Sequence, residues 1–312
     1  MAPKKKDNFF DFPRPCDNQN LVGHTAVVNA FTDAWKSRDN YPIHPVWMLT
    51  GPKGIGKATL AYKLAQHIFS DLTGRSEEEI AQQISVGGIG DLHIVDIEHN
   101  LTDGKPVKSI TIKTIWNMID RMHMHSMAES WRVVIIDSMD ELSDKAPNAL
   151  LKVLEEPPAK TIFFLIAHSL DRVFPTIRSR SRIEKLRPLP PLELRSIAAK
   201  LLPDHEISND MIKISGGSFG RIANLVATGA DTLFDDAKRI LTEQSNGSDY
   251  LTLAKRIAKN PENISILLDV ISHFGLAEEY GIAQAEIERM HIVNLEPESV
   301  AFKIITDIKK CL

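Results

Sequence analysis

The sequence of 312 residues contains only two cysteines, Cys16 and Cys311, far apart in the chain. A structural zinc site usually needs about four Cys or His ligands close together, so a four-cysteine zinc site is excluded. Scarce cysteine also favours a reducing compartment, so we expect a cytoplasmic protein. No run of about 18 apolar residues occurs, and a membrane-spanning helix is therefore not expected.

An excess of charge of either sign is also absent. The formal net charge is −4, from 37 basic and 41 acidic residues. A chain built to bind DNA over a broad surface would carry a strong positive balance, so any DNA contact is expected to be local or made through partner subunits. The apolar content of 43% is ordinary for a globular protein, and the length allows about two or three domains.

What the sequence does contain is a phosphate-binding loop pattern in TGPKGIGKATLAYKLAQHIF, residues 50–69. Apolar residues before the loop predict a buried strand, and apolar residues at every fourth position after it predict a helix. In such a strand–loop–helix unit, backbone N–H groups and the helix N-terminus bind phosphate. The residues assigned to this site are Gly51, Lys53, Gly54, Gly56, Lys57, Ala58 and Thr59.

One position of this loop departs from the pattern. Ala58 stands where a Ser or Thr hydroxyl normally holds Mg²⁺. Thr59 lies one residue further, about 100° around the helix, and cannot simply replace it. The sequence therefore predicts nucleotide binding, with ATP and Mg²⁺ as the expected ligands, more strongly than it predicts hydrolysis. A Gly-rich turn that no longer binds nucleotide is the alternative.

A second candidate is Asp137, which ends the apolar strand VVII at residues 133–136. A carboxylate at the end of a buried strand can orient Mg²⁺ and its waters. The alternative is an Asp that caps the following helix. Apolar strands at 47–49, 92–97, 133–136 and 161–167 alternate with helical patterns, which predicts an α/β fold with a parallel sheet. Residues 231–312 show helical patterns throughout.

NALLKVLEEPP at 148–158 and TIRSRS at 176–181, at their spacing from the loop and from Asp137, resemble the clamp-loader subunits of bacterial DNA polymerase III. Within that AAA+ family, the resemblance is strongest to delta-prime subunits, in a form common in alphaproteobacteria. It implies an AAA+ domain at 1–190, a small helical lid at 191–230 and an all-helical collar domain at 231–312. It also implies a hetero-pentamer with ATPase subunits and delta, which loads a sliding clamp onto primed DNA.

The resemblance assigns roles to two arginines. Arg180, in Ser179-Arg180-Ser181, matches the arginine that reaches the ATP of the neighbouring subunit in this family. A surface ion pair is the alternative for Arg180. Arg221 matches a lid arginine that contacts phosphate, although Gly220 shifts it by one place, and a plain helix start is the alternative.

The resemblance also argues against catalysis. The family's ATPases follow the strand-end Asp with Glu, whereas this chain has Ser138, and the family's sensor position falls at or beside His168. We therefore expect a non-hydrolysing stator that supplies Arg180 in trans. An active AAA+ ATPase remains open as the alternative, because Lys57 and Asp137 are both present.

Overall fold

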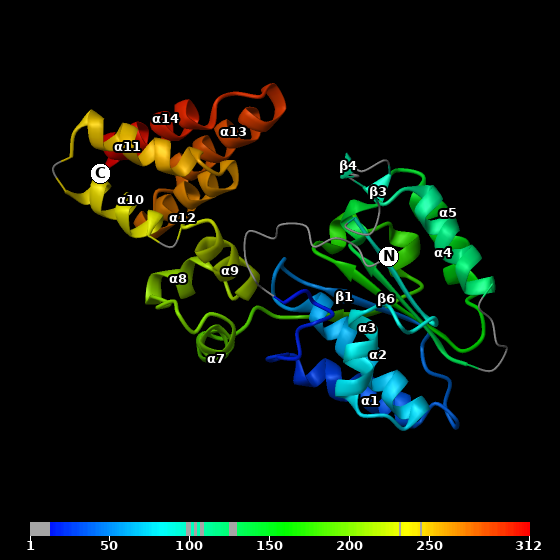
Figure 1. Cartoon of the computed structure of the whole chain (residues 1–312). Helices are drawn as coiled ribbons and strands as arrows, with labels where there is room; N and C mark the ends of the chain where they lie inside the picture. Colours follow the sequence, from blue (N-terminus) through cyan, green and yellow to red (C-terminus); the bar gives the residue numbers. More distant parts are fainter. Residues whose placement is uncertain are drawn as a thin grey trace. The chain divides into compact units, whose positions relative to one another are not determined.

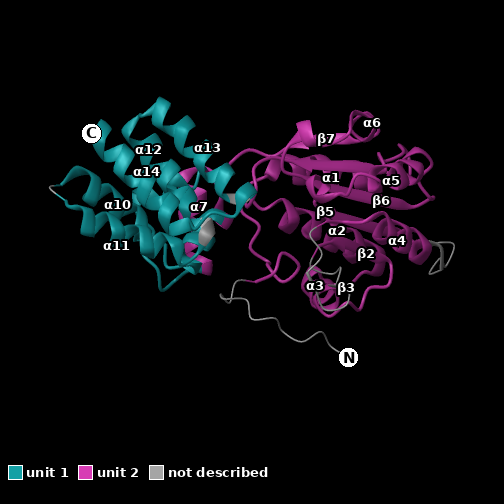
Figure 2. Cartoon of the chain, turned by 90° about the horizontal axis from the view of Figure 1, so that it is seen from above, with its two compact units in different colours: residues 1–11, 202–216, 221–312 teal, residues 12–201, 217–220 magenta. Residues whose placement is uncertain are grey.

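The computed structural model describes residues 13–97, 101–102, 105–106, 109–124, 130–230, 232–243 and 245–312. These residues form two compact units (Figure 2). The described part of one unit comprises residues 13–201 and 217–220, and the other comprises 202–216 and 221–312. The division at 190 and 230 that the family resemblance implies stays a prediction. Within the described residues, no helix is long and apolar enough to cross a membrane.

A five-stranded parallel sheet (Figure 1) organises the unit that contains residues 13–201, drawn in magenta in Figure 2. Its strands are β1 (Val46–Thr50), β2 (Leu92–Asp96), β5 (Arg132–Asp137), β6 (Thr161–Ala167) and β7 (Arg182–Lys185), in the order β2-β5-β6-β1-β7. A separate short antiparallel pair consists of β3 (Leu101–Thr102) and β4 (Lys105–Pro106). The predicted α/β class with a parallel sheet is confirmed.

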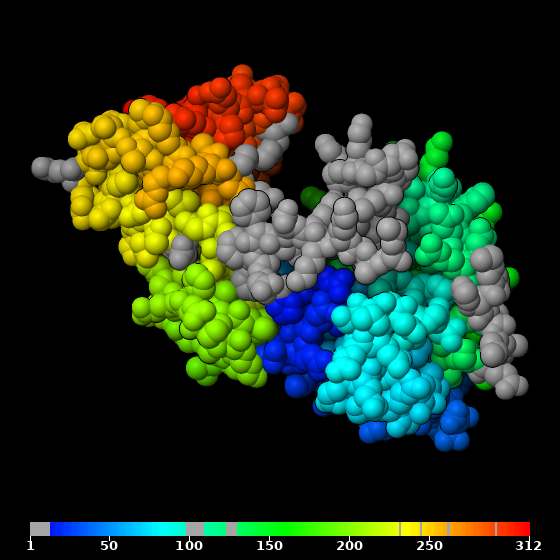
Figure 3. Space-filling model, in the orientation of Figure 1, coloured from blue at the N-terminus to red at the C-terminus, as the bar shows by residue number. Residues whose placement is uncertain are grey.

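Helices cover both faces of this sheet. On one face lie α1 (Thr25–Lys36), α2 (Lys57–Thr73) and α3 (Glu77–Ser85); on the other lie α4 (Ile112–Met124), α5 (Ala146–Glu155) and α6 (Pro175–Arg178). Alternate strand residues enter the two cores, because successive side chains of a strand point to opposite faces. Thus Trp47 and Phe164 pack on the first side, and Met48 and Phe163 on the second. In Figure 3 the cyan atoms of the α2–α3 segment form part of the outer surface, at the bottom of the view.

Helix α3 and strand β7 are among the elements of this unit that were not predicted. Helix α3 falls in an acidic segment, and a capping box between Ser76 and Glu79 starts it. Strand β7 lies at the sheet edge, with Arg182 and Lys185 exposed, so it lacks an apolar pattern. The chain also contains three described 3₁₀ turns: η1 (Met139–Glu141), η2 (Leu170–Arg172) and, in the helical part, η3 (Pro261–Ile264).

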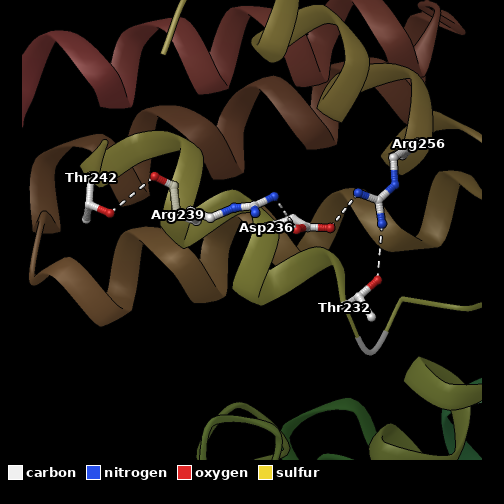
Figure 4. A network of polar contacts seen from close by, with 5 residues as sticks. All are labelled: Thr232, Asp236, Arg239, Thr242 and Arg256. Atoms are coloured by element: carbon white, nitrogen blue, oxygen red, sulfur yellow. Dashed lines mark hydrogen bonds and ion pairs between the residues drawn. The ribbon is translucent and has the colours of Figure 1, made fainter. Parts of the chain in front are cut away.

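The rest of the chain is helical. Its helices are α7 (Pro191–Leu201), α8 (Asn209–Ile214), α9 (Phe219–Ala227), α10 (Leu233–Thr242), α11 (Gly247–Ala258), α12 (Ser265–Phe274), α13 (Ala277–Val293) and α14 (Pro297–Cys311). Asp236 of α10 accepts hydrogen bonds from Arg239 and from Arg256 of α11, and Arg256 also donates to Thr232 (Figure 4). This network joins two helices of the C-terminal bundle, which the sequence predicted to be all-helical.

Candidate nucleotide-binding site

The phosphate loop connects β1 to α2, as the sequence predicted. Gly51, Gly54 and Gly56 have φ angles of 148°, 80° and 98°. These values favour glycine, since side chains rarely tolerate them. Space is also restricted, because a Cβ on Gly51 would lie 2.5 Å from the carbonyl oxygen of Leu186. The glycines are thus required by the loop geometry that turns backbone N–H groups towards a bound phosphate.

Lys57, the first residue of α2, is buried inside this loop, with 3% of its surface exposed. Its Nζ donates to the carbonyl oxygens of Gly51 at 2.6 Å and Pro52 at 2.7 Å. An ammonium has three N–H donors, so one remains for a phosphate oxygen. Burial lowers the pKa of Lys57 to about 8, opposed by the charges of Asp137 and Asp140. Lys57 therefore stays mainly charged at neutral pH and can bind an anion.

Asp137 ends β5 and is paired in register with Asp96, the last residue of β2. Burial raises the pKa of Asp137 to about 6, and the negative charges of Asp96 and Glu141 add to the shift, while Lys57 opposes it. At position 58 the alanine side chain offers no oxygen ligand. The residues fit the phosphates of a nucleotide through the loop and Lys57, whereas a Mg²⁺ ion would find Asp137 without the usual hydroxyl partner.

Ser138 and Asp140 are the first two polar residues after Asp137. The hydroxyl of Ser138 is buried, with 1% of the residue exposed, and has no hydrogen-bond partner among the described residues. Both carboxylate oxygens of Asp140 accept backbone N–H groups, from His168 at 2.6 Å and from Ser169 at 3.1 Å. Asp140 is therefore engaged in joining η1 to the end of β6. A positioned base contributes roughly 10²–10⁴-fold in rate, and Asp140 is poorly placed to act as one.

His168 occupies the expected sensor position after β6. Its pKa is lowered to about 4, first by burial and then by the charge of Lys57. The ring is therefore neutral at physiological pH. Its Nδ1 atom is buried and finds no hydrogen-bond partner in the part of the chain that the structure describes. Among the residues that the structure describes, no group of three or more His, Cys, Asp or Glu side chains is placed to hold a metal ion.

The segment before Arg221 contacts the phosphate loop directly. The Gly220 N–H donates to the Gly54 carbonyl oxygen at 2.9 Å, and the Ser218 hydroxyl donates to the Lys53 carbonyl oxygen at 2.8 Å. A Cβ on Gly220 would lie 2.7 Å from the Gly54 Cα. Gly220, which shifts the lid arginine by one place, is thus required by a backbone contact. No local pattern links residues 54 and 220, so the sequence alone does not predict this contact.

The two arginines have carboxylate partners. Arg221 forms an ion pair with Asp269 of α12, whose pKa is raised by burial and lowered in turn by Arg221. The phosphate role of Arg221 stays a prediction. Arg180, just after α6, pairs with Glu155 of α5 at 2.7 Å. The partners of Arg180 are thus on α5 and α6 and not in the phosphate loop.

Comparison with known proteins settles the family. The protein-family model described as "DNA polymerase III, delta subunit" matches residues 23–190, which contain the loop, Asp137 and Arg180. The chain belongs to this family. It is therefore a member of the DNA polymerase III clamp-loader group with the AAA+ fold, and the resemblance found in the sequence is confirmed.

Individual relatives agree. The chain is 24% identical over 295 residues to DNA polymerase III subunit gamma of Buchnera aphidicola, covering 90% of this chain and 71% of the relative. It is 28% identical over 179 residues to subunit delta′ of Pseudomonas aeruginosa, covering 55% of this chain and only 52% of the relative. A gamma-subunit-related protein of Thermotoga maritima shares the fold, with a TM-score of 0.50 and 14% identity over 91% of this chain and 98% of that chain.

Proposed function

We propose that this clamp-loader family member is a delta-prime-like subunit that acts as a stator and supplies Arg180 to the ATP site of a neighbouring subunit. The observation that carries the proposal is a well-formed phosphate loop followed by Ala58, which offers no hydroxyl to Mg²⁺. Lys57 lies inside the loop and keeps one donor for a phosphate. Ala58 provides no Mg²⁺ ligand, and Asp140 is bound to backbone N–H groups. ATP would therefore bind weakly or persist without turnover.

The assembly proposed is a hetero-pentamer with ATPase subunits and delta, in the cytoplasm. In this assembly, ATP binding opens a sliding clamp, and the complex places it on primed DNA. DNA is reached through the complex, which agrees with the net charge of −4. The alphaproteobacterial type stays a prediction.

The position of Arg180 supports its role in trans. Its side chain is 36% exposed, so it is accessible to a neighbouring subunit. Its described partners are Glu155, Thr176 and Ser179, none of them in the chain's own phosphate loop. An arginine that completes a neighbour's site can be worth roughly 10³–10⁵ in kcat, because it stabilises charge on the transferred phosphoryl group.

An active ATPase is the second candidate, favoured by Lys57 and by Asp137 at the end of β5. Measuring ATP binding and turnover by the purified chain with Mg²⁺ distinguishes an active ATPase from the proposed stator. We expect turnover at the background level, unchanged in Lys57→Ala. Clear turnover that Lys57→Ala abolishes would establish the active ATPase instead.

The trans role is tested in the reconstituted loader. Arg180→Ala should leave the subunit folded and assembled while strongly lowering ATP turnover at the adjacent site. Arg178→Ala, two residues away at the end of α6, is the matched control and should have little effect. Turnover in Arg180→Ala equal to that of Arg178→Ala would remove the trans role.

A further inference from the structure

Arg180 does not extend freely from the surface. Its Nη2 atom forms an ion pair with Oε1 of Glu155 at 2.7 Å. Its Nη1 atom donates to the Thr176 carbonyl oxygen at 3.0 Å and lies 3.5 Å from the Ser179 hydroxyl. The guanidinium is thus fixed from two sides, by the last residue of α5 and by the C-terminal turn of α6.

Glu155 is an unexpected residue at this position if only stability is considered. It is the last residue of α5, where the helix dipole disfavours a negative charge. The Glu155 side chain is 50% exposed and that of Arg180 is 36% exposed. An ion pair this exposed contributes little to folding, since water screens it. The pair therefore has more consequence for the orientation of Arg180 than for the stability of the fold.

We propose that Glu155 is the positioning residue of Arg180, and that it orients the guanidinium in advance for the outer phosphates of a nucleotide bound to the neighbouring subunit. The described bonds use both Nη1 hydrogens and one on Nη2, which leaves the Nε–H and the second Nη2 hydrogen for phosphate oxygens. An arginine side chain loses much rotational freedom when it is ordered, and the ion pair removes that freedom before the subunits meet. The inference rests on the trans role of Arg180 proposed above.

Pre-orientation gives a specific kinetic expectation. An arginine that must be ordered during the reaction stabilises the transition state less well, so kcat falls, while the neighbour's own ATP binding and KM are little changed. We expect Glu155→Ala to lower kcat of the reconstituted loader about 3–10-fold, far less than Arg180→Ala. Glu155→Gln keeps an acceptor oxygen without its charge and should fall between wild type and Glu155→Ala.

The test measures steady-state ATP turnover of the reconstituted loader, with assembly and thermal midpoint checked for each variant. Glu156→Ala is the matched control, because Glu156 is the adjacent acidic residue, caps the C-terminus of α5 and is exposed. It should retain wild-type kcat. In an Arg180→Ala background, Glu155→Ala should cause no further loss, since its effect acts through the arginine.

Three outcomes would overturn the inference. Wild-type kcat in Glu155→Ala, together with a strong loss in Arg180→Ala, would show that the arginine needs no orienting partner. A higher kcat in Glu155→Ala would show that Glu155 restrains Arg180. A further loss in the double variant would show a role that does not pass through Arg180. If Arg180→Ala itself is without effect, the proposed function fails and the inference falls with it.

Discussion

The contact between the phosphate loop and residue 220 leads to a sharp prediction for Gly220→Ala. Gly220 lies in the first turn of α9 and has no positive φ, so alanine suits its backbone. In an unrestricted helix this change would add up to about 1 kcal/mol of stability, because alanine is the better helix former. Here, however, the new methyl group would lie 2.7 Å from the Gly54 Cα and 3.3 Å from its carbonyl oxygen.

The expected magnitude follows from these opposing terms. Forcing a methyl group into a filled space costs about 1–3 kcal/mol, since the neighbours must move. Separating the two backbones also removes the hydrogen bond from Gly220 N–H to the Gly54 carbonyl oxygen, worth about 1 kcal/mol. After the gain in helix propensity, a net loss of about 1–3 kcal/mol in the free energy of unfolding is expected.

Urea unfolding and hydrogen exchange of the loop amides measure this effect. Gly281→Ala is the matched control, because Gly281 lies within α13, has no positive φ, and a Cβ there would meet nothing within 4 Å. We expect faster exchange at residues 53–57 and a lower midpoint in Gly220→Ala, and an unchanged or higher midpoint in Gly281→Ala. If both variants gain stability equally, the close contact between Gly54 and Gly220 does not exist in solution.

Three further predictions concern the same unit. Asp140→Ala should lower the free energy of unfolding by about 2–3 kcal/mol, because two backbone N–H groups lose their carboxylate partner. Asp140→Asn should lower the free energy of unfolding by less, and chemical denaturation measures both variants. The pKa of His168 is lowered to about 4, so as the pH drops from 6.5 to about 4 the unfolded chain takes up a proton that the folded chain does not, and the free energy of unfolding decreases. His168→Asn should make this decrease smaller by roughly 1–2 kcal/mol in urea unfolding measured across that pH range. A pH profile identical to that of the wild type would contradict this prediction. Phe164→Ala should cost about 3–5 kcal/mol, because Phe164 is fully buried against Phe31, and a thermal midpoint near wild type would show that this core is less tightly packed than described.

Local sequence patterns predicted the centre of the sheet and most helices. Strands β1, β5 and β6 are buried nearly throughout, which produces continuous apolar runs in the sequence. Helix α3 could have been found from Ser76 and Glu79, whose spacing is that of a capping box. Strand β7 could not have been found from its sequence, because it lies at the sheet edge. Its pairing with β1 decides its conformation more than its own residues do.

Part of the candidate site could likewise be predicted from local sequence, and part could not. The loop glycines and Lys57 form a contiguous motif, so the sequence located them. Other contacts join distant residues: Asp140 with His168 and Gly54 with Gly220 at the site, and Glu155 with Arg180 away from the loop. Such pairs have no fixed spacing, and only the folded chain brings them together.

These contacts also give the glycines of the phosphate loop a structural reason that does not depend on nucleotide hydrolysis. The glycine at 51 is needed because Leu186 packs against it, and the glycine at 54 is needed because Ser218 and Gly220 do. Lys57 donates two hydrogen bonds to the loop's own carbonyl oxygens. The loop therefore has a structural role within this unit that requires neither Mg²⁺ nor ATP turnover. The proposed stator role would use this rigidity, because Arg180 can serve a neighbouring site only if the unit that carries it holds its shape.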